Sequence, residues 1–130
     1  FLVLDVAHNP AGARFLRRQL QARYPSRRFV AVQGMLSDKD PARVVEGHSA
    51  EVSEWICAPS GGARGQSSAD IARRLPTGAR AQVALDVRHA LTLALQSSAL
   101  SSRPEDGILA LGSFSLVAQV SVCLDAGAIP

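Results

Sequence analysis

The stretch FLVLDVAHNP, residues 1–10, joins a nearly continuous apolar run over residues 1–7 to an Asn-Pro pair. A short apolar run without polar alternation is typical of a strand that is covered on both faces. Asn9 suits a helix cap, and Pro10 suits the first helical position, because the N–H that proline lacks has no partner there. The apolar residues that follow recur at helical spacing: Ala13, Leu16, Leu20 and Tyr24. The stretch therefore predicts a buried strand that leads directly into an amphipathic helix.

The same alternation continues along the chain. Further strands are predicted at residues 29–34, 54–58, around residue 83, and 107–113, and helices are predicted after residues 40, 67 and 113 and over 86–98. In the helix over 86–98 we expect five residues to face inward: Val87, Ala90, Leu91, Ala94 and Leu95. Alternating strands and helices imply parallel pairing through crossover helices. We therefore expect an α/β fold: a Rossmann-like open, mostly parallel sheet of five to six strands with helices on both faces.

Size and charge narrow the class of protein. The chain has 130 residues, 47% of them hydrophobic, which suits one domain with a single core. The 14 basic and 11 acidic residues leave a net charge of +3, and only 5% of the residues are aromatic. A weak net charge and few stacking side chains argue against a nucleic-acid partner.

Cysteines and apolar runs bear on the compartment. Cys57 and Cys123 each lie in an apolar run, where a buried free thiol is expected, and this favours the cytoplasm. No apolar stretch approaches the 18–20 residues or so that span a bilayer, so we expect no membrane association. The chain opens on Phe1 inside a strand-like run, which suggests a piece of a longer polypeptide.

Uncommon polar residues gather in the loops that follow predicted strands. In open parallel sheets, ligands bind beyond the carboxyl ends of the strands. The four loops are residues 5–9, 34–40, 58–66 and 112–114, and their candidate site residues are Asp5, His8, Asn9, Lys39, Arg64 and Ser113. Each of these has a purely structural alternative: Asp5 bonds loop amides, His8 braces the turn, Asn9 and Ser113 cap helices, and the cations are solvated. Their convergence on one sheet edge predicts a binding site.

Several sharper motifs are absent. The glycine-rich segment GGARGQSS, residues 61–68, has no lysine before its serines and does not match a phosphate-binding P-loop. The loop after the first strand lacks the glycine fingerprint of a dinucleotide site. Two isolated cysteines and three scattered histidines give no zinc spacing, so no metal site is expected in this chain. A nucleotide enzyme that is complete within these residues is therefore not expected.

Four motifs together resemble a known family. Residues 5–10, DVAHNP, resemble the D-[GV]-A-H-N-P motif of folylpolyglutamate synthases, which belong to the Mur ligase superfamily. Residues 35–40, MLSDKD, resemble their M-x-x-D-K-D loop, and WICAP at 55–59, followed by Arg64-Gly65, is similar to the segment after their next strand. Gly112-Ser113-Phe114 to Val117 resembles their closing G-S-x-x-x-V pattern. The motifs occur in the family's order over residues 2 to about 120, and their variants look most like the bacterial form that is also a dihydrofolate synthase.

The resemblance implies a function. Residues 1–130 would be the C-terminal, glutamate- and ATP-contacting domain of an ATP-dependent amide ligase, and a P-loop ATPase domain with the Mg²⁺ ligands would lie upstream. The enzyme would join L-glutamate to dihydropteroate or a folate through an acyl phosphate, as a cytoplasmic monomer. Asp5, His8 and Asn9 would lie on the ATP side, with His8 also near the reacting groups. Lys39, Ser113 and Arg64 would contact glutamate.

Two other functions remain open at this point. Six arginines between residues 14 and 28 could form a polyanion-binding face: Arg14, Arg17, Arg18, Arg23, Arg27 and Arg28. A Rossmann-like module that senses a nucleotide without catalysis is the other alternative.

Overall fold

The computed structural model describes residues 2–5, 10–35, 40–47, 51–59, 65–97 and 106–127. Its strands are β1 (Leu2–Leu4), β2 (Phe29–Gln33), β3 (Val52–Cys57), β4 (Ala81–Val83) and β5 (Gly107–Leu111). Its helices are α1 (Pro10–Arg23), α2 (Pro41–Gly47), α3 (Ser68–Arg73), α4 (Val87–Leu95) and α6 (Phe114–Asp125). The elements alternate as the sequence predicts.

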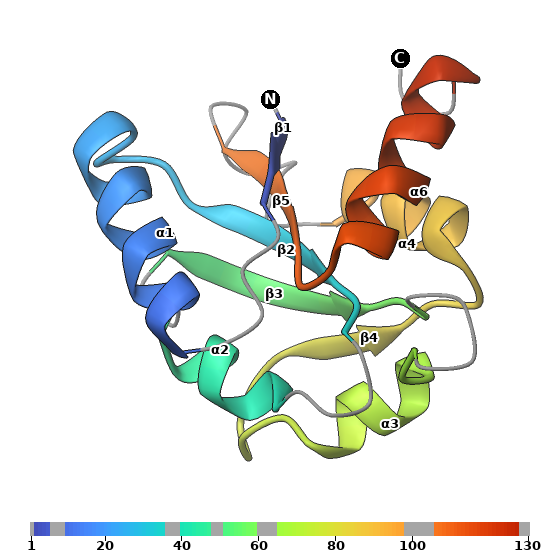
Figure 1. Ribbon diagram of the computed structural model, residues 1–130, viewed down its shortest axis with the longest axis horizontal. Helices are drawn as coiled ribbons and strands as arrows, with labels where there is room; N and C mark the ends of the chain where they lie inside the picture. The colour runs from blue at the N-terminus through green and yellow to red at the C-terminus, as the bar shows by residue number, and fades with distance from the viewer. Residues whose placement is uncertain are drawn as a thin grey trace.

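The described strands form one parallel sheet in the order β1-β5-β2-β3-β4. From β1 to β4 the chain moves across the sheet in one direction, and it then returns to place β5 between β1 and β2. Because crossovers between parallel strands are right-handed, this reversal sends the later helices to the opposite face. Accordingly α1 and α2 cover one face, and α4 and α6 cover the other (Figure 1). The predicted α/β architecture is confirmed.

Two apolar layers hold the sheet between its helices. Beneath α1 and α2, Leu16, Leu20 and Val44 pack against β2 and β5 residues such as Leu109. On the other face, the buried side of α4 and α6 packs against Val30, Val32 and Ile56, among others. The central strands β2 and β5 are buried at every position. Each layer removes aliphatic surface from water, which is the main force that holds such a fold together.

Side-chain caps fix where several helices begin. Asp40 accepts a hydrogen bond from the backbone N–H of Ala42 (3.1 Å), just before α2. Ser67 caps α3 by accepting from the N–H of Asp70 at 3.1 Å, and Asp86 caps α4 in the same way. These side chains pair N–H groups that have no partner within their own helix. The helix starts predicted at Asp40-Pro41, Ser67 and Asp86 are confirmed.

Three expectations about burial and bounds are wrong. The first strand is not covered along its whole length: Val3 and Leu2 pack against the apolar layers on opposite faces, but Leu4 is 36% exposed. Leu95 does not face inward, because it ends the helix and is 39% exposed. The third strand begins at Val52, two residues earlier than expected, where an irregularity in its pairing with β2 lets Val52 join the core beside Phe29.

Candidate functional site at the carboxyl edge of the sheet

The carboxyl ends of the strands line up along one edge, as predicted. Just beyond β1, the backbone N–H of Asp5 donates to the carbonyl of Ala110 at 2.9 Å. Just beyond β2, the N–H of Gly34 donates to the carbonyl of Leu111 at 3.2 Å. These bonds continue the ladders of β1 and β2 on either side of β5. The loops after three neighbouring strands therefore leave the sheet side by side.

The strand order marks one point on this edge. The chain leaves β5 for α6 on one face, whereas it leaves the two flanking strands for α1 and α2 on the other face. Loops that diverge in this way leave a crevice between them, and ligands of open α/β sheets bind at such reversals. Gly112 and Ser113 follow β5 at the reversal, with Asp5 on one side and Gly34 on the other. This topology supports the predicted binding edge independently of the sequence motifs.

A close backbone approach holds the centre of the edge together. Gly112 has φ +121°, a conformation that side chains rarely adopt. A Cβ atom added there would overlap the carbonyl oxygen of Gly34 and would lie 3.2 Å from Cγ of Met35. Glycine at residue 112 is therefore required both by its φ angle and by its neighbours. The contact fixes the position of Ser113 relative to the end of β2.

Ser113 is buried and caps α6. Its Oγ accepts a hydrogen bond from the backbone N–H of Leu116 at 3.1 Å, and 6% of the residue is exposed. The structural alternative for this residue is therefore confirmed. A hydroxyl that already accepts from the helix still has its own hydrogen to donate to an anionic oxygen. Contact with glutamate stays a prediction.

Asp5 is half-buried at the end of β1, on the strand next to the one that Ser113 follows. Its place at the rim suits a carboxylate that accepts hydrogen bonds from a bound ligand. The structure thus brings Asp5 and Ser113 to the same edge, although they are far apart in the chain. The other candidates, His8, Asn9, Lys39 and Arg64, lie outside the described residues. The residues that flank them in the chain, such as Asp5, Met35 and Gly65, are described.

Gln33 is a buried polar residue that the sequence reading missed. It ends β2, is fully buried, and its Nε2 lies 3.7 Å from Sδ of Met35. Within the described ranges, no hydrogen-bond partner meets its Oε1. Leaving a buried amide oxygen unpaired costs about 1–3 kcal/mol, so Gln33 occupies this position at some cost in stability. The only signal was a glutamine at the end of an apolar run.

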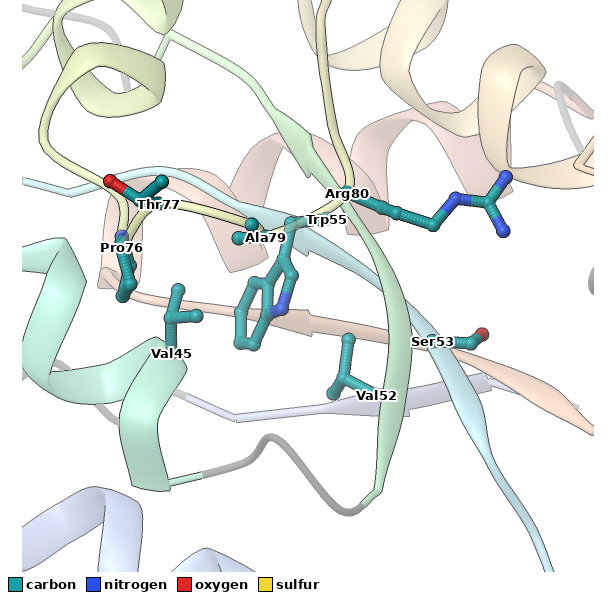
Figure 2. A pocket seen from close by; sticks show the side chains of 9 residues that line it. Val45, Val52, Ser53, Trp55, Pro76, Thr77, Ala79 and Arg80 are labelled. Atoms are coloured by element: carbon teal, nitrogen blue, oxygen red, sulfur yellow. The ribbon is translucent and has the colours of Figure 1, made fainter.

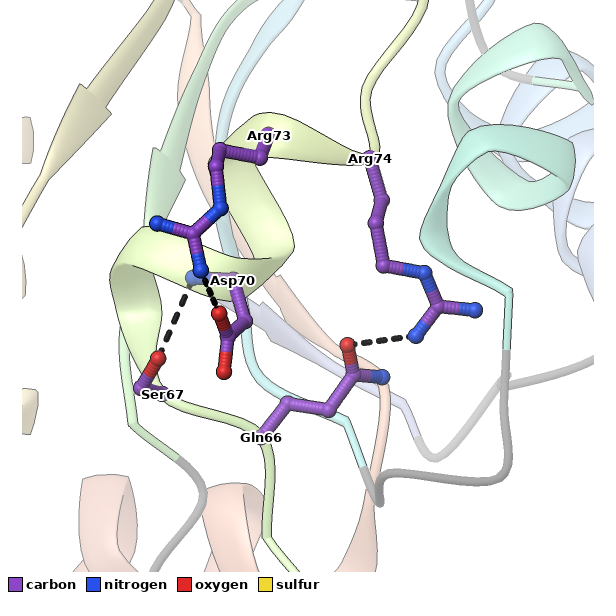
Figure 3. A network of polar contacts seen from close by, with 5 residues as sticks. All are labelled: Gln66, Ser67, Asp70, Arg73 and Arg74. Carbon is purple, nitrogen blue, oxygen red and sulfur yellow. Dashed lines mark hydrogen bonds and ion pairs between the residues drawn. The ribbon is translucent and has the colours of Figure 1, made fainter.

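A polar network beside the third loop was also missed. Figure 3 shows Arg74, just after α3, reaching the side chain of Gln66; its Nη1 donates to Oε1 at 2.7 Å. In the same network, Arg73 pairs with Asp70 along the helix. The backbone N–H of Gln66 donates to the carbonyl of Met35 at 2.8 Å, which ties the third loop to the second. The network therefore adjoins the candidate site.

A cavity of about 420 Å³ lies away from the candidate site, between β3 and the segment that leads into β4 (Figure 2). Val52 and Ser53 from the start of β3, and Arg80 just before β4, line it together with the indole of Trp55. These are the amino ends of the strands, opposite to the candidate edge. The wall is mostly aliphatic and aromatic. Its one charged lining residue, Arg80, pairs with Glu54 at 3.6 Å, so the cavity offers no unpaired cation to the carboxylates and phosphates that the predicted site would bind.

The arginines of residues 14–28 are partly used within the fold. Arg17 pairs with Glu51 at 3.3 Å, Arg27 lies 5.7 Å from the ring centroid of Tyr24, and Arg28 donates to a backbone carbonyl of β3 at 3.2 Å. Three of the six candidate polyanion contacts therefore have structural roles. No described feature of this face favours the polyanion-binding alternative.

The two cysteines differ in their surroundings. Both are free thiols. Cys57 is fully buried in β3, and burial raises the pKa of its thiol from 9.0 to about 12, because the thiolate would lose its hydration. Cys123 in α6 is only half-buried, so the prediction of a buried thiol is confirmed for Cys57 alone.

The described residues also bear on the predictions about a metal site and a membrane span. Among them, no three His, Cys, Asp or Glu side chains come together as a metal site would require. Within the same ranges, every helix is too short or too polar to cross a bilayer.

Comparison with known proteins gives a consistent result. Residues 1–114 match the family model of the Mur ligase glutamate ligase domain. The dihydrofolate synthase/folylpolyglutamate synthase of Escherichia coli (strain K12) is 33% identical over 125 residues, which are 96% of this chain and 28% of that protein.

Solved structures agree with the sequence comparison. The E. coli FolC complex with DHPP and ADP superposes with a TM-score of 0.82 at 33% identity, over 98% of this chain and 29% of that one. A bifunctional folylpolyglutamate synthase/dihydrofolate synthase with Mn, AMPPNP and L-glutamate bound superposes with a TM-score of 0.77 at 40% identity, over 95% of this chain and 29% of that one. The chain thus spans a little over a quarter of the relatives that it matches. By its motifs, its topology and these comparisons, the chain belongs to the Mur ligase family, as a glutamate ligase domain.

Proposed function

We propose that the polypeptide carrying this chain is an ATP-dependent amide ligase that joins L-glutamate to dihydropteroate, to folates, or to both. The observation that carries this proposal is the meeting of Asp5 and Ser113 at adjacent strand ends, at the reversal of strand order. The relatives support it, since structures of similar proteins hold ADP with DHPP, or AMPPNP with Mn and L-glutamate.

The chemistry follows from a poor leaving group. A carboxylate oxygen does not leave when an amine attacks, so the carboxylate of the pterin substrate first takes the γ-phosphoryl group of ATP and ADP is released. The glutamate amine then attacks the acyl phosphate, an amide forms, and inorganic phosphate leaves together with a proton. Negative charge develops during both steps, and cations and oriented N–H groups around it lower the barrier.

The proposed roles distribute along the carboxyl edge. Asp5 accepts hydrogen bonds from the ATP ribose hydroxyls, which its half-buried carboxylate at the rim suits. His8 and Asn9 lie on the nucleotide side, and His8 also serves the reacting groups. Lys39, a compact cation, binds a glutamate carboxylate. The glutamate side also includes Ser113 and Arg64.

We propose that a P-loop ATPase domain lies upstream and closes over this edge. The chain itself has no P-loop motif, and it spans only 28% of its E. coli relative. The Mg²⁺ ligands belong to that domain in this proposal, as the resemblance to folylpolyglutamate synthases implies. Mg²⁺, when bound, neutralises phosphate charge. Closure would align the nucleotide, the acyl phosphate and the amine and would exclude water.

Two further expectations belong to the proposal. Free thiols at Cys57 and Cys123 support a reducing compartment, the cytoplasm. We also expect a monomer that binds neither nucleic acid nor membranes.

The experiment is a ligase assay with two proteins: the full-length polypeptide and residues 1–130 alone. We expect ATP- and glutamate-dependent product from the first and negligible product from the second. Robust turnover by residues 1–130 would refute the two-domain proposal, and no ligation by the full-length protein would refute the activity.

Two variants of the full-length protein test the roles. Lys39→Ala should raise the KM for glutamate more than the KM for ATP, and Asp5→Ala should do the reverse. An unchanged glutamate KM in Lys39→Ala would remove that residue from the site.

A further inference from the structure

A second, polar pocket of about 340 Å³ lies beside α3, and no role has been assigned to it. Figure 3 shows four of its lining residues; the full set is Gly65, Gln66, Asp70, Arg73 and Arg74. Gly65 directly follows Arg64 in the chain, and the N–H of Gln66 bonds the carbonyl of Met35, which begins the MLSDKD motif. The pocket therefore borders both loops that carry the proposed glutamate-binding cations.

The two arginines of the pocket are in different electrostatic states. Arg73 pairs with Asp70 three residues earlier, so the two charges cancel. Arg74 has no acidic partner within the described ranges. Its contact is the neutral amide of Gln66, which accepts from Nη1 at 2.7 Å. The pocket therefore carries one uncompensated positive charge, located on Arg74.

Gln66 also fixes the direction in which Arg74 points. Only 5% of Gln66 is exposed, so its amide is held by the surrounding fold, whereas Arg74 itself is exposed. One of the five guanidinium N–H groups is used by this bond, and the rest remain as a planar set of donors. Such a fork matches the two oxygens of a carboxylate, and an arginine that is already oriented loses less side-chain entropy on binding.

We propose that Arg74 is a carboxylate-binding residue of the ligase site, positioned by Gln66, and that its ligand is a carboxylate of glutamate. The inference rests on the proposed function. A glutamate presents this group from one of two sources: the incoming L-glutamate, or the glutamyl tail of a folate acceptor. The uncompensated charge on Arg74 suits a carboxylate from either source.

The test is steady-state kinetics of the full-length protein with Arg74→Gln, and with Arg73→Gln as the matched control. A charge-assisted hydrogen bond at an exposed site predicts a KM rise of about tenfold. If the incoming amino acid is the ligand, the rise is in the KM for L-glutamate. If the glutamyl tail is the ligand, it is in the KM for folate monoglutamate, while dihydropteroate, which has no tail, is unaffected.

The control should leave every KM within about twofold, because exposed ion pairs contribute little. Equal effects of the two substitutions, no effect of either, or a rise confined to the KM for ATP would each overturn the inference. A wild-type protein that ligates no glutamate would instead refute the proposed function itself, and the inference with it.

A second variant tests the role of Gln66 without removing the arginine. Gln66→Glu keeps the shape of the side chain but places a carboxylate against Arg74, where it competes with the ligand. We expect the same KM to rise as in Arg74→Gln, with unchanged circular dichroism. A folded Gln66→Glu variant with wild-type constants would contradict the positioning role.

Discussion

Gly112→Ala tests whether the junction between β5 and β2 is as tight as the structure requires. Two costs add at this residue. Holding alanine at φ +121° costs about 1–3 kcal/mol of backbone strain. The new methyl group overlaps the Gly34 carbonyl, and because that carbonyl is backbone, the end of β2 must shift, for about 1–3 kcal/mol more. We expect the free energy of unfolding to fall by about 4 kcal/mol in total.

Gly78→Ala is the matched control, since it separates strain from overlap. Gly78 also has positive φ, +93°, but nothing lies within 4 Å of an added Cβ. It should therefore show the strain alone, about 1–2 kcal/mol, with little or no shift of its neighbours.

The assay is urea unfolding of residues 1–130, followed by far-UV circular dichroism and by the fluorescence of Trp55, which is buried in the core. Coincident transitions from the two probes would justify a two-state analysis. A loss in Gly112→Ala no larger than that in Gly78→Ala would show that the close approach to Gly34 carries no energetic weight.

Three further outcomes are expected. Ser113→Ala removes the α6 cap and should lower the free energy of unfolding by about 1 kcal/mol in urea titrations, an effect that Ser113→Asp should largely avoid. Cys57 should resist a thiol reagent at pH 8 while Cys123 reacts, and unfolding in urea should make Cys57 reactive as well. Burial raises the pKa of the Cys57 thiol from 9.0 to about 12, so the protonated thiol stabilises the fold fully below pH 9 and progressively less above it. The urea midpoint should therefore fall as the pH rises above 9. Arg80→Ala removes the cation 3.6 Å from the buried Glu54 carboxylate and should lower the free energy of unfolding by about 1–2 kcal/mol, measured by thermal or urea unfolding. Adding Glu54→Gln to that variant should restore most of the loss. Additive losses in the double variant would contradict the pairing.

Much of the fold could be predicted because it depends on local patterns. Apolar runs, the Asn9-Pro10 and Asp40-Pro41 pairs, and helical spacing are properties of neighbouring residues, and the described elements follow them. Strand order is not a local property. That β5 inserts between β1 and β2, and so leaves β1 at the edge of the sheet, cannot be read from residues 1–7.

The same distinction applies to the candidate site. The rule that ligands bind at the carboxyl ends of parallel strands predicts the edge that holds Asp5 and Ser113. It does not predict that these two residues follow adjacent strands. Arg74 could not be found in this way, because it follows a helix rather than a strand. Its proximity to the edge depends on the fold that brings Gln66 to Met35.

The insertion of β5 also has a consequence for how the protein is synthesised. β5, which joins β1 to β2, is the last of the five described strands to leave the ribosome: residue 108 pairs with residue 2 on one side and with residue 30 on the other. Until then, the nascent polypeptide keeps two apolar strand edges without their shared neighbour, a state prone to aggregation. Contacts between such distant residues also slow folding. A polypeptide that ends before residue 107 would therefore depend on chaperones, although more than four fifths of residues 1–130 would be present.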